Sequence, residues 1–170
     1  MSAAFAFIGL GSNLAHPRRQ LALALQRVAR LPRTELLRVS PSYRTAALGA
    51  PNPQPDYVNA VALVRTALAP RALLARLHAI ERRHGRRRGG DVPRNAARTL
   101  DLDLLLYGAR RSRTPALTLP HPRMHERAFV LRPLTDIDPA AVIPGRGLAR
   151  PRLRALRGQA IARTHARALP

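Results

Sequence analysis

The sequence predicts an α+β sandwich in which helices pack against one mainly antiparallel sheet. Four segments have the short apolar or alternating pattern of strands, two have helical periodicity, and they follow the order β-α-β-β-α-β. In a split βαβ arrangement of this kind we expect the helices on one face of the sheet and the functional site on the other. We also expect the first and fourth strands near the centre of the sheet.

The first half of the chain supplies three of the strands and one helix. Residues 4–10 are apolar and end in a Gly-Ser-Asn turn, which is typical of a strand. Pro17 opens a helix to about Leu31, with leucines and a valine on one face. Residues 35–45 and 57–66 are expected strands, separated by a loop rich in Pro, Gly and Asn.

The second half supplies the remaining elements. Pro70 opens a second helix to about Glu81, with its leucines and an isoleucine facing inward. An irregular stretch rich in Arg and Gly, residues 84–97, leads into the fourth strand over residues 98–107. A short helix is expected over residues 124–134.

The length of 170 residues is enough for one domain with its own core. We expect this domain over residues 1–147. We expect residues 148–170 to form a basic tail, helical or disordered, because Pro144 to Pro170 contains several arginines and no acidic residue.

The formal net charge is +21, and all 30 basic residues are Arg because the chain has no Lys. The absence of Lys excludes a phosphate-binding-loop lysine and a Schiff-base lysine. The chain also has no Cys, which excludes a disulfide and a thiol nucleophile. The charge suggests an anionic partner, although compositional drift explains most of the arginines equally well. Aromatic residues make up only 4%, which argues against a nucleic-acid partner, because few side chains could stack on bases.

The apolar run over residues 3–10 is too short for a signal peptide or membrane span, so we expect a cytoplasmic protein that binds no membrane.

The most informative segment is Arg-Thr-Leu-Asp-Leu-Asp, residues 98–103. Because side chains alternate along a strand, Asp101 and Asp103 share one face, with Cα atoms roughly 7 Å apart. Two carboxylates on a largely apolar strand need a cation, and Mg²⁺ prefers a few carboxylates completed by substrate phosphates and water. The alternative is a pair of solvated acids bound to neighbouring arginines.

Arginines gather immediately before this strand. Residues 81–90 contain five, and Arg94 and Arg98 continue the series. One guanidinium group can bind two phosphate oxygens at once, so the segment is a candidate phosphate clamp. Its glycines would allow the loop to move. A solvated basic loop is the alternative.

Other polar side chains could bind a ligand beside these charges. Tyr57 and Asn59 point to one face of their strand and could grip a flat heterocycle, or Tyr57 could be a core residue. His121, flanked by prolines, could donate a hydrogen bond to phosphate or cap a turn.

Taken together, these segments resemble the 6-hydroxymethyl-7,8-dihydropterin pyrophosphokinases, a family of folate biosynthesis. The resemblance covers residues 5–147 and is carried, in the family's order, by residues 8–14, 43–45, 54–60, 81–88, 98–103 and 120–129.

The resemblance implies a ferredoxin-like α+β fold and an ATP-dependent transferase that moves pyrophosphate from MgATP to the hydroxymethyl group of the pterin and releases AMP. It implies two Mg²⁺ ions on Asp101 and Asp103, small-molecule substrates and a monomer. The implied catalytic residues are Arg86, Arg88 and Arg98. The implied ATP contacts are Glu81, Arg86, Arg88, Arg94, Arg98, Leu104, Thr118, His121 and Arg127. The implied pterin contacts are Thr45, Ala46, Leu48, Tyr57, Asn59 and Phe129.

Several positions depart from the family's best-known pattern. Ala46 stands in place of proline, Asn95 and Pro122 in place of aromatic residues, and His78 in place of glutamine. These departures affect the expected adenine contacts and not the carboxylate pair.

A basic RNA-binding module is the alternative from another class, because ferredoxin-like sheets also bind RNA. The sequence lacks an aromatic-rich central strand, and unmetallated aspartates would repel phosphate. We therefore expect no nucleic-acid partner.

Overall fold

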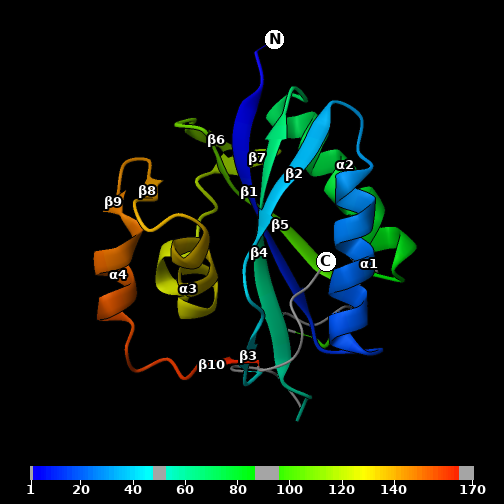
Figure 1. The fold of residues 1–170 in the computed structure, drawn as a ribbon, viewed down its shortest axis with the longest axis vertical. Coiled ribbons are helices and arrows are strands. Elements are labelled where there is room, and N and C mark those ends of the chain that lie inside the picture. The colour runs from blue at the N-terminus through cyan, green and yellow to red at the C-terminus, as the bar shows by residue number, and fades with distance from the viewer. Residues whose placement is uncertain (1, 48–52, 87–95, 165–170) are drawn as a thin grey trace.

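The computed structural model describes residues 2–47, 53–86 and 96–164. Within them a six-stranded antiparallel sheet has helices on both faces, and two further sheets have two strands each (Figure 1). The elements are, in order, β1 (Ala4–Ser12), α1 (Pro17–Ala29), β2 (Thr34–Val39), β3 (Tyr43–Thr45), β4 (Tyr57–Thr66), α2 (Pro70–Arg83), β5 (Asp101–Tyr107), β6 (Ser112–Thr114), β7 (Leu117–Leu119), the 3₁₀ turn η1 (Met124–Glu126), α3 (Ala128–Ile137), β8 (Val142–Ile143), β9 (Gly147–Leu148), α4 (Ala149–Ala155) and β10 (Ala162–Arg163).

The strand order is β10-β3-β4-β1-β5, and β2 also pairs with β4. All pairings in this sheet are antiparallel. The prediction that the first and fourth predicted strands are central is wrong for the fourth, because β5 pairs only with β1 among the described residues. Strand β4 pairs with β1 on one side and with β2 and β3 on the other. It therefore occupies one edge of β1, and β5 pairs with the other edge. The aspartates therefore lie on an edge strand and not in the middle of the sheet.

Helices cover both faces of the sheet, so the expectation of helices on one face only is also wrong. On one face α1 and α2 pack on the core built around Ile8, Leu102 and Val64. On the other face the apolar side of α3, including Leu131 and Leu134, covers Phe7 and other residues of the sheet (Figure 1). This second helical layer leaves the ends of β1, β4 and β5 open toward a cavity.

The predicted strand over residues 35–45 is two strands with a break. Ser40 Oγ accepts a hydrogen bond from the Val61 amide at 2.9 Å, and the Ser40 amide donates to the Val61 carbonyl at 2.9 Å. Pro41 follows and has no N–H for the ladder, so pairing resumes only at Tyr43. The hairpin of β6 and β7 has no counterpart among the predicted elements.

The segment after residue 147 is attached to the sheet as far as residue 164. Helix α4 packs on α3, and β10 pairs with β3. The Thr164 amide donates to the Ser42 carbonyl at 2.9 Å, and Arg18 Nη1 donates to Thr164 Oγ1 at 2.9 Å. These bonds hold the described end of the chain beside β3.

His84, at the C-terminus of α2, joins three parts of the fold. Its Nδ1 lies 2.6 Å from Gln20 Oε1 of α1, and its carbonyl accepts a hydrogen bond from Thr99 Oγ1 at 2.6 Å. Its Nε2 is buried and has no hydrogen-bond partner within the described ranges. Burial, and then the nearby Arg27, lower the pKa of His84 below its usual value.

A lowered folded-state pKa means that protonation of His84 destabilises the fold. The free energy of unfolding should therefore fall as pH drops below about 6.5, where unfolded histidine takes up a proton. In His84→Asn the side-chain amide can still donate to Gln20 but does not titrate. We expect the stability advantage of wild type over this variant to shrink between about pH 8 and about pH 5.

Urea denaturation of both proteins across this pH range measures the difference. A constant difference at every pH would contradict the account of His84.

Candidate active site

A cavity of about 490 Å³ opens on the sheet face that α3 only partly covers. We call it the central cavity. The ends of β1, β3, β4 and β5 form its floor, and the segment leading into α3 forms one wall. Its lining includes eleven of the residues predicted for the site: Thr45, Ala46, Tyr57, Asn59, Arg86, Arg98, Asp101, Asp103, His121, Arg127 and Phe129.

Asp101 and Asp103 both line the central cavity, whereas Leu102 and Leu104 are buried in the core on the opposite face. The alternation predicted from the sequence thus places the two carboxylates side by side on one face of β5. The backbone of the pair is fixed by the pairing of Asp101 with Gly11 and of Asp103 with Gly9.

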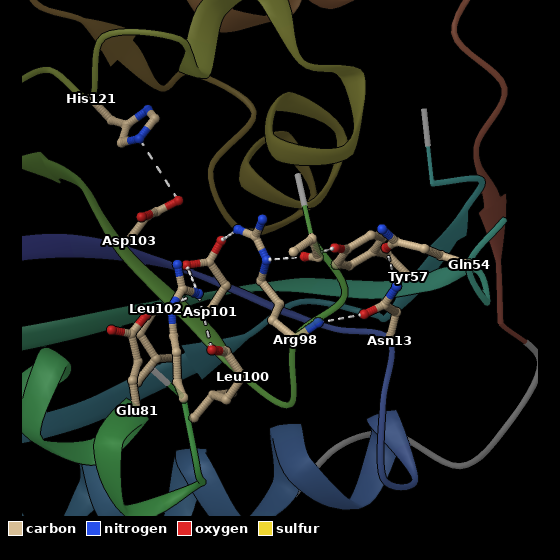
Figure 2. A network of polar contacts seen from close by, with 12 residues as sticks. Asn13, Gln54, Tyr57, Glu81, Arg98, Leu100, Asp101, Leu102, Asp103 and His121 are labelled. Atoms are coloured by element: carbon tan, nitrogen blue, oxygen red, sulfur yellow. Dashed lines mark hydrogen bonds and ion pairs between the residues drawn. The ribbon is translucent and has the colours of Figure 1, made fainter. Parts of the chain in front are cut away.

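Two arginines bind the Asp101 carboxylate (Figure 2). Arg86 Nη1 donates to Oδ1 and also to the Leu100 carbonyl at 3.1 Å. Arg98 Nη1 donates to Oδ2 at 2.9 Å. Burial is the largest single influence on Arg98 and opposes its charged form. The neighbouring titratable groups, Asp101 first, together outweigh burial and raise the pKa of Arg98. Two of the predicted cationic residues, Arg86 and Arg98, are thus bound to Asp101.

His121 faces the second carboxylate (Figure 2). Its Nε2 lies 3.7 Å from Asp103 Oδ2, while its Nδ1 accepts a hydrogen bond from the Arg123 amide at 3.3 Å. Since Nδ1 is an acceptor, the neutral ring carries its proton on Nε2. Burial first, and then Arg127, lower the pKa of His121 to about 4. His121 is therefore a neutral donor aimed at the carboxylate side of the central cavity.

Arg127 lies in a crowded cationic environment. Burial, and then the neighbouring Arg123, lower the pKa of the Arg127 guanidinium. Because Arg98 also opposes its charge, an anion in the central cavity would stabilise this cluster. The side chain lies over the Phe129 ring, 5.6 Å from its centroid.

The other end of the cavity floor combines an aromatic ring with an amide. Asn59 is buried, and its Nδ2 donates to Thr45 Oγ1 at 2.9 Å. Tyr57 donates its hydroxyl to the Ala96 carbonyl at 3.3 Å (Figure 2). A Cβ atom at Gly11 would lie 3.1 Å from Asn59 Oδ1, so a side chain there would push this amide back by a few tenths of an ångström.

Three predicted ATP contacts lie outside the cavity lining. Glu81 is buried in α2, where its Oε1 accepts the Leu102 amide at 2.8 Å and lies 3.5 Å from Arg86 Nη1. Leu104 belongs to the core beneath the sheet, and Thr118 is exposed on β7. The remaining predicted contacts, Leu48, Arg88 and Arg94, lie outside the described residues, as does Asn95.

Two features of the site were not predicted from the sequence. Gln159, Ala160 and Ile161 form part of the cavity wall, although they lie in the predicted tail. Asn13 Nδ2 donates to Gln54 Oε1 at 3.0 Å, and Asn13 Oδ1 accepts the Arg98 amide at 2.8 Å (Figure 2). These contacts join segments distant in sequence, so no local pattern could have indicated them.

Comparison with known proteins identifies the family. A family model described as 7,8-dihydro-6-hydroxymethylpterin-pyrophosphokinase matches residues 7–139. The chain belongs to this family. A 2-amino-4-hydroxy-6-hydroxymethyldihydropteridine pyrophosphokinase from Pseudomonas aeruginosa is 50% identical over 138 residues, which is 81% of this chain and 83% of that protein. A protein of the same name from Haemophilus influenzae is 47% identical over 139 residues, 82% of this chain and 84% of the relative.

Solved structures agree on the fold. The wild-type HPPK-DHPS of Plasmodium falciparum with pterin and p-hydroxybenzoate matches with a TM-score of 0.68 and 13% identity. The match covers 90% of this chain and 43% of that one, so this chain spans less than half the length of the matched structure. At this identity the likeness concerns the fold alone, and it confirms the predicted ferredoxin-like α+β class. The RNA-binding alternative finds no support in these comparisons.

Substitution of Glu81 tests whether its buried hydrogen bond to the Leu102 amide stabilises β5. Glu81→Ala leaves the buried Leu102 amide without this acceptor, so we expect a loss of about 2 kcal/mol in the free energy of unfolding. Glu81→Gln keeps an acceptor oxygen and should cost less. Urea denaturation measures both changes.

Glu35→Ala is the matched control, because Glu35 is exposed and pairs with Arg65 at the surface. Its loss should cost no more than about 1 kcal/mol. If Glu81→Ala is no more destabilising than this control, the buried hydrogen bond does not support β5.

Proposed function

We propose that this protein transfers pyrophosphate from MgATP to the hydroxymethyl oxygen of 6-hydroxymethyl-7,8-dihydropterin and releases AMP, a step of folate biosynthesis. The observation that carries this proposal is the meeting, in one cavity, of the Asp101–Asp103 pair, a cluster of arginines and the Tyr57–Asn59 pair. The names of relatives up to 50% identical to the chain support the same reaction.

The carboxylate pair fits magnesium. Asp101 and Asp103 offer hard oxygen donors from one strand face at the cavity wall, and the phosphates of a nucleotide can complete the octahedron. We propose that these two residues hold two Mg²⁺ ions, which would neutralise part of the triphosphate charge. Asp101 must then exchange its arginine partners for metal, which leaves Arg86 and Arg98 available for phosphate oxygens.

The cationic side of the cavity fits the triphosphate. Arg86, Arg98 and Arg127 supply guanidinium groups, and His121 supplies an Nε2–H donor. Charge moves toward the departing AMP as the bond between the β-phosphorus and its bridging oxygen breaks, and fixed cations stabilise this change. The predicted ATP-binding set also includes Glu81, Arg88, Arg94, Leu104 and Thr118.

The opposite side of the cavity fits a flat polar heterocycle. The Asn59 amide and Thr45 hydroxyl can pair with ring nitrogens and the exocyclic amine, and Tyr57 and Phe129 offer ring faces. Ala46 and Leu48 complete the predicted pterin set. With the heterocycle held here, its hydroxymethyl oxygen would lie toward the carboxylates, in position to attack the β-phosphorus.

We propose that the partners are small molecules and that the protein acts as a cytoplasmic monomer. Within the described part of the chain, no helix is long and apolar enough to cross a membrane.

Neutralising either carboxylate should abolish most turnover. We expect Asp101→Asn or Asp103→Asn to lower kcat about 10³-fold at saturating Mg²⁺, as expected for loss of a preorganised charged group at the reacting phosphates. Asp56→Asn is the control, because Asp56 is exposed and pairs only loosely with Arg44, at 3.5 Å. Wild-type turnover in both site variants would contradict the metal assignment.

The reaction itself is tested by AMP release from MgATP with and without the pterin. We expect AMP only when 6-hydroxymethyl-7,8-dihydropterin is present, in equal amount to the pyrophosphorylated pterin found by chromatography. AMP release without the pterin, or none with it from protein that binds ATP, would contradict the proposed acceptor.

A further inference from the structure

Helix α3 carries Phe129 in its first turn, and its first amide obtains its hydrogen bond from a distant part of the chain. The first four N–H groups of a helix have no acceptor within the helix. Arg127, at the N-cap, makes no side-chain capping bond. Instead Gln159 Oε1 accepts the Ala128 N–H at 2.8 Å, although the two residues are 31 positions apart.

The same Gln159 amide makes a second bond on the other side of Arg127. Gln159 Nε2 donates to the Glu126 carbonyl at 2.8 Å. One side chain therefore fixes the peptide groups on both sides of Arg127, whose own backbone is extended (φ −122°, ψ 107°). Both bonds are thus made to the backbone segment that carries Arg127 and Phe129, whose side chains lie against each other.

Gln159 is itself held at both ends. Its backbone N–H donates to the Leu156 carbonyl at 2.9 Å, just after α4. A few residues later β10 pairs with β3, and Thr164 bonds to Ser42 and Arg18. The segment from Gln159 to Ile161 is thus stretched along the cavity wall between two fixed points.

We propose that Gln159 is a positioning residue that holds Arg127 and Phe129 in the arrangement needed to bind triphosphate and pterin together. This inference rests on the proposed function of the central cavity. It assigns residues of the C-terminal segment to the substrate site, because a single amide there sets the spacing between an ATP contact and a pterin contact.

The test compares Gln159→Met with Arg157→Met. The first variant keeps the side-chain volume and removes both bonds. The second introduces the same residue at an exposed position whose side chain lies outside the central cavity. We expect Gln159→Met to weaken pterin binding by calorimetry and to raise the pterin KM about tenfold, the effect of one to two lost hydrogen bonds. In Gln159→Met we also expect faster hydrogen exchange at the Ala128 backbone amide. In Arg157→Met we expect pterin affinity, pterin KM and this exchange rate to stay as in wild type.

A double-mutant cycle separates positioning from simple structural support. If Gln159 acts through Phe129, Gln159→Met should cause no further loss of pterin affinity in a Phe129→Ala background. Equal pterin affinity in wild type and Gln159→Met would overturn the proposal, and so would a tenfold loss that persists without Phe129.

Failure of the proposed reaction is distinguishable from failure of this inference. Wild type that binds the pterin but releases no AMP would contradict the reaction, while the affinity comparison still decides the positioning role. Wild type that does not bind the pterin would overturn both.

Discussion

The site depends on the ion pairs that Asp101 forms with Arg86 and Arg98. Asp101 lies on an edge strand, at the rim of a core whose other residues are largely apolar, so its carboxylate needs a strong partner. The two arginines come from the end of α2 and from the approach to β5. A single carboxylate therefore brings together both ends of the arginine-rich segment, at the point where the segment meets the cavity.

The charges around this pair are arranged for exchange of partners. Burial, and then the neighbouring Arg123 and Arg98, oppose the charge of Arg127. In the proposed reaction a polyanion with its metal ions would satisfy these groups: the carboxylates would hold metal, the guanidinium groups would bind phosphate, and His121 would donate through Nε2. Glu81 accepts the Leu102 amide, so β5 would stay fixed while the carboxylates on its cavity face exchange ligands in the proposed reaction.

Much of the cavity lining could be predicted from the sequence because it is encoded locally. Alternation along one strand places Asp101 and Asp103 together, and the same rule places Tyr57 and Asn59. The order of the six main elements also follows from their periodicity. The position of β5 at the sheet edge could not be predicted in this way, because it depends on which side of β1 the returning hairpin occupies.

The hydrogen bonds of Asn13 and Gln159 could not be predicted from the sequence either. Each acts through side-chain bonds to the backbone of segments distant along the chain, and an Asn or Gln at such a position has no distinctive local pattern. Likewise, Glu81 lies among exposed arginines in the sequence, yet the helix turns it inward beneath β5. Tertiary packing, and not propensity, decided the placement of these residues.

The central claim is that Asp101 exchanges its arginines for metal when the substrates bind. The most direct measurement is a crystal structure with Mg²⁺, the pterin and α,β-methylene-ATP, whose scissile oxygen is replaced by carbon. The account predicts that Arg86 and Arg98 leave Asp101 and lie within about 3.2 Å of phosphate oxygens, with Mg²⁺ on both aspartates. A complex in which both arginines remain on Asp101 and the metal binds elsewhere would contradict it.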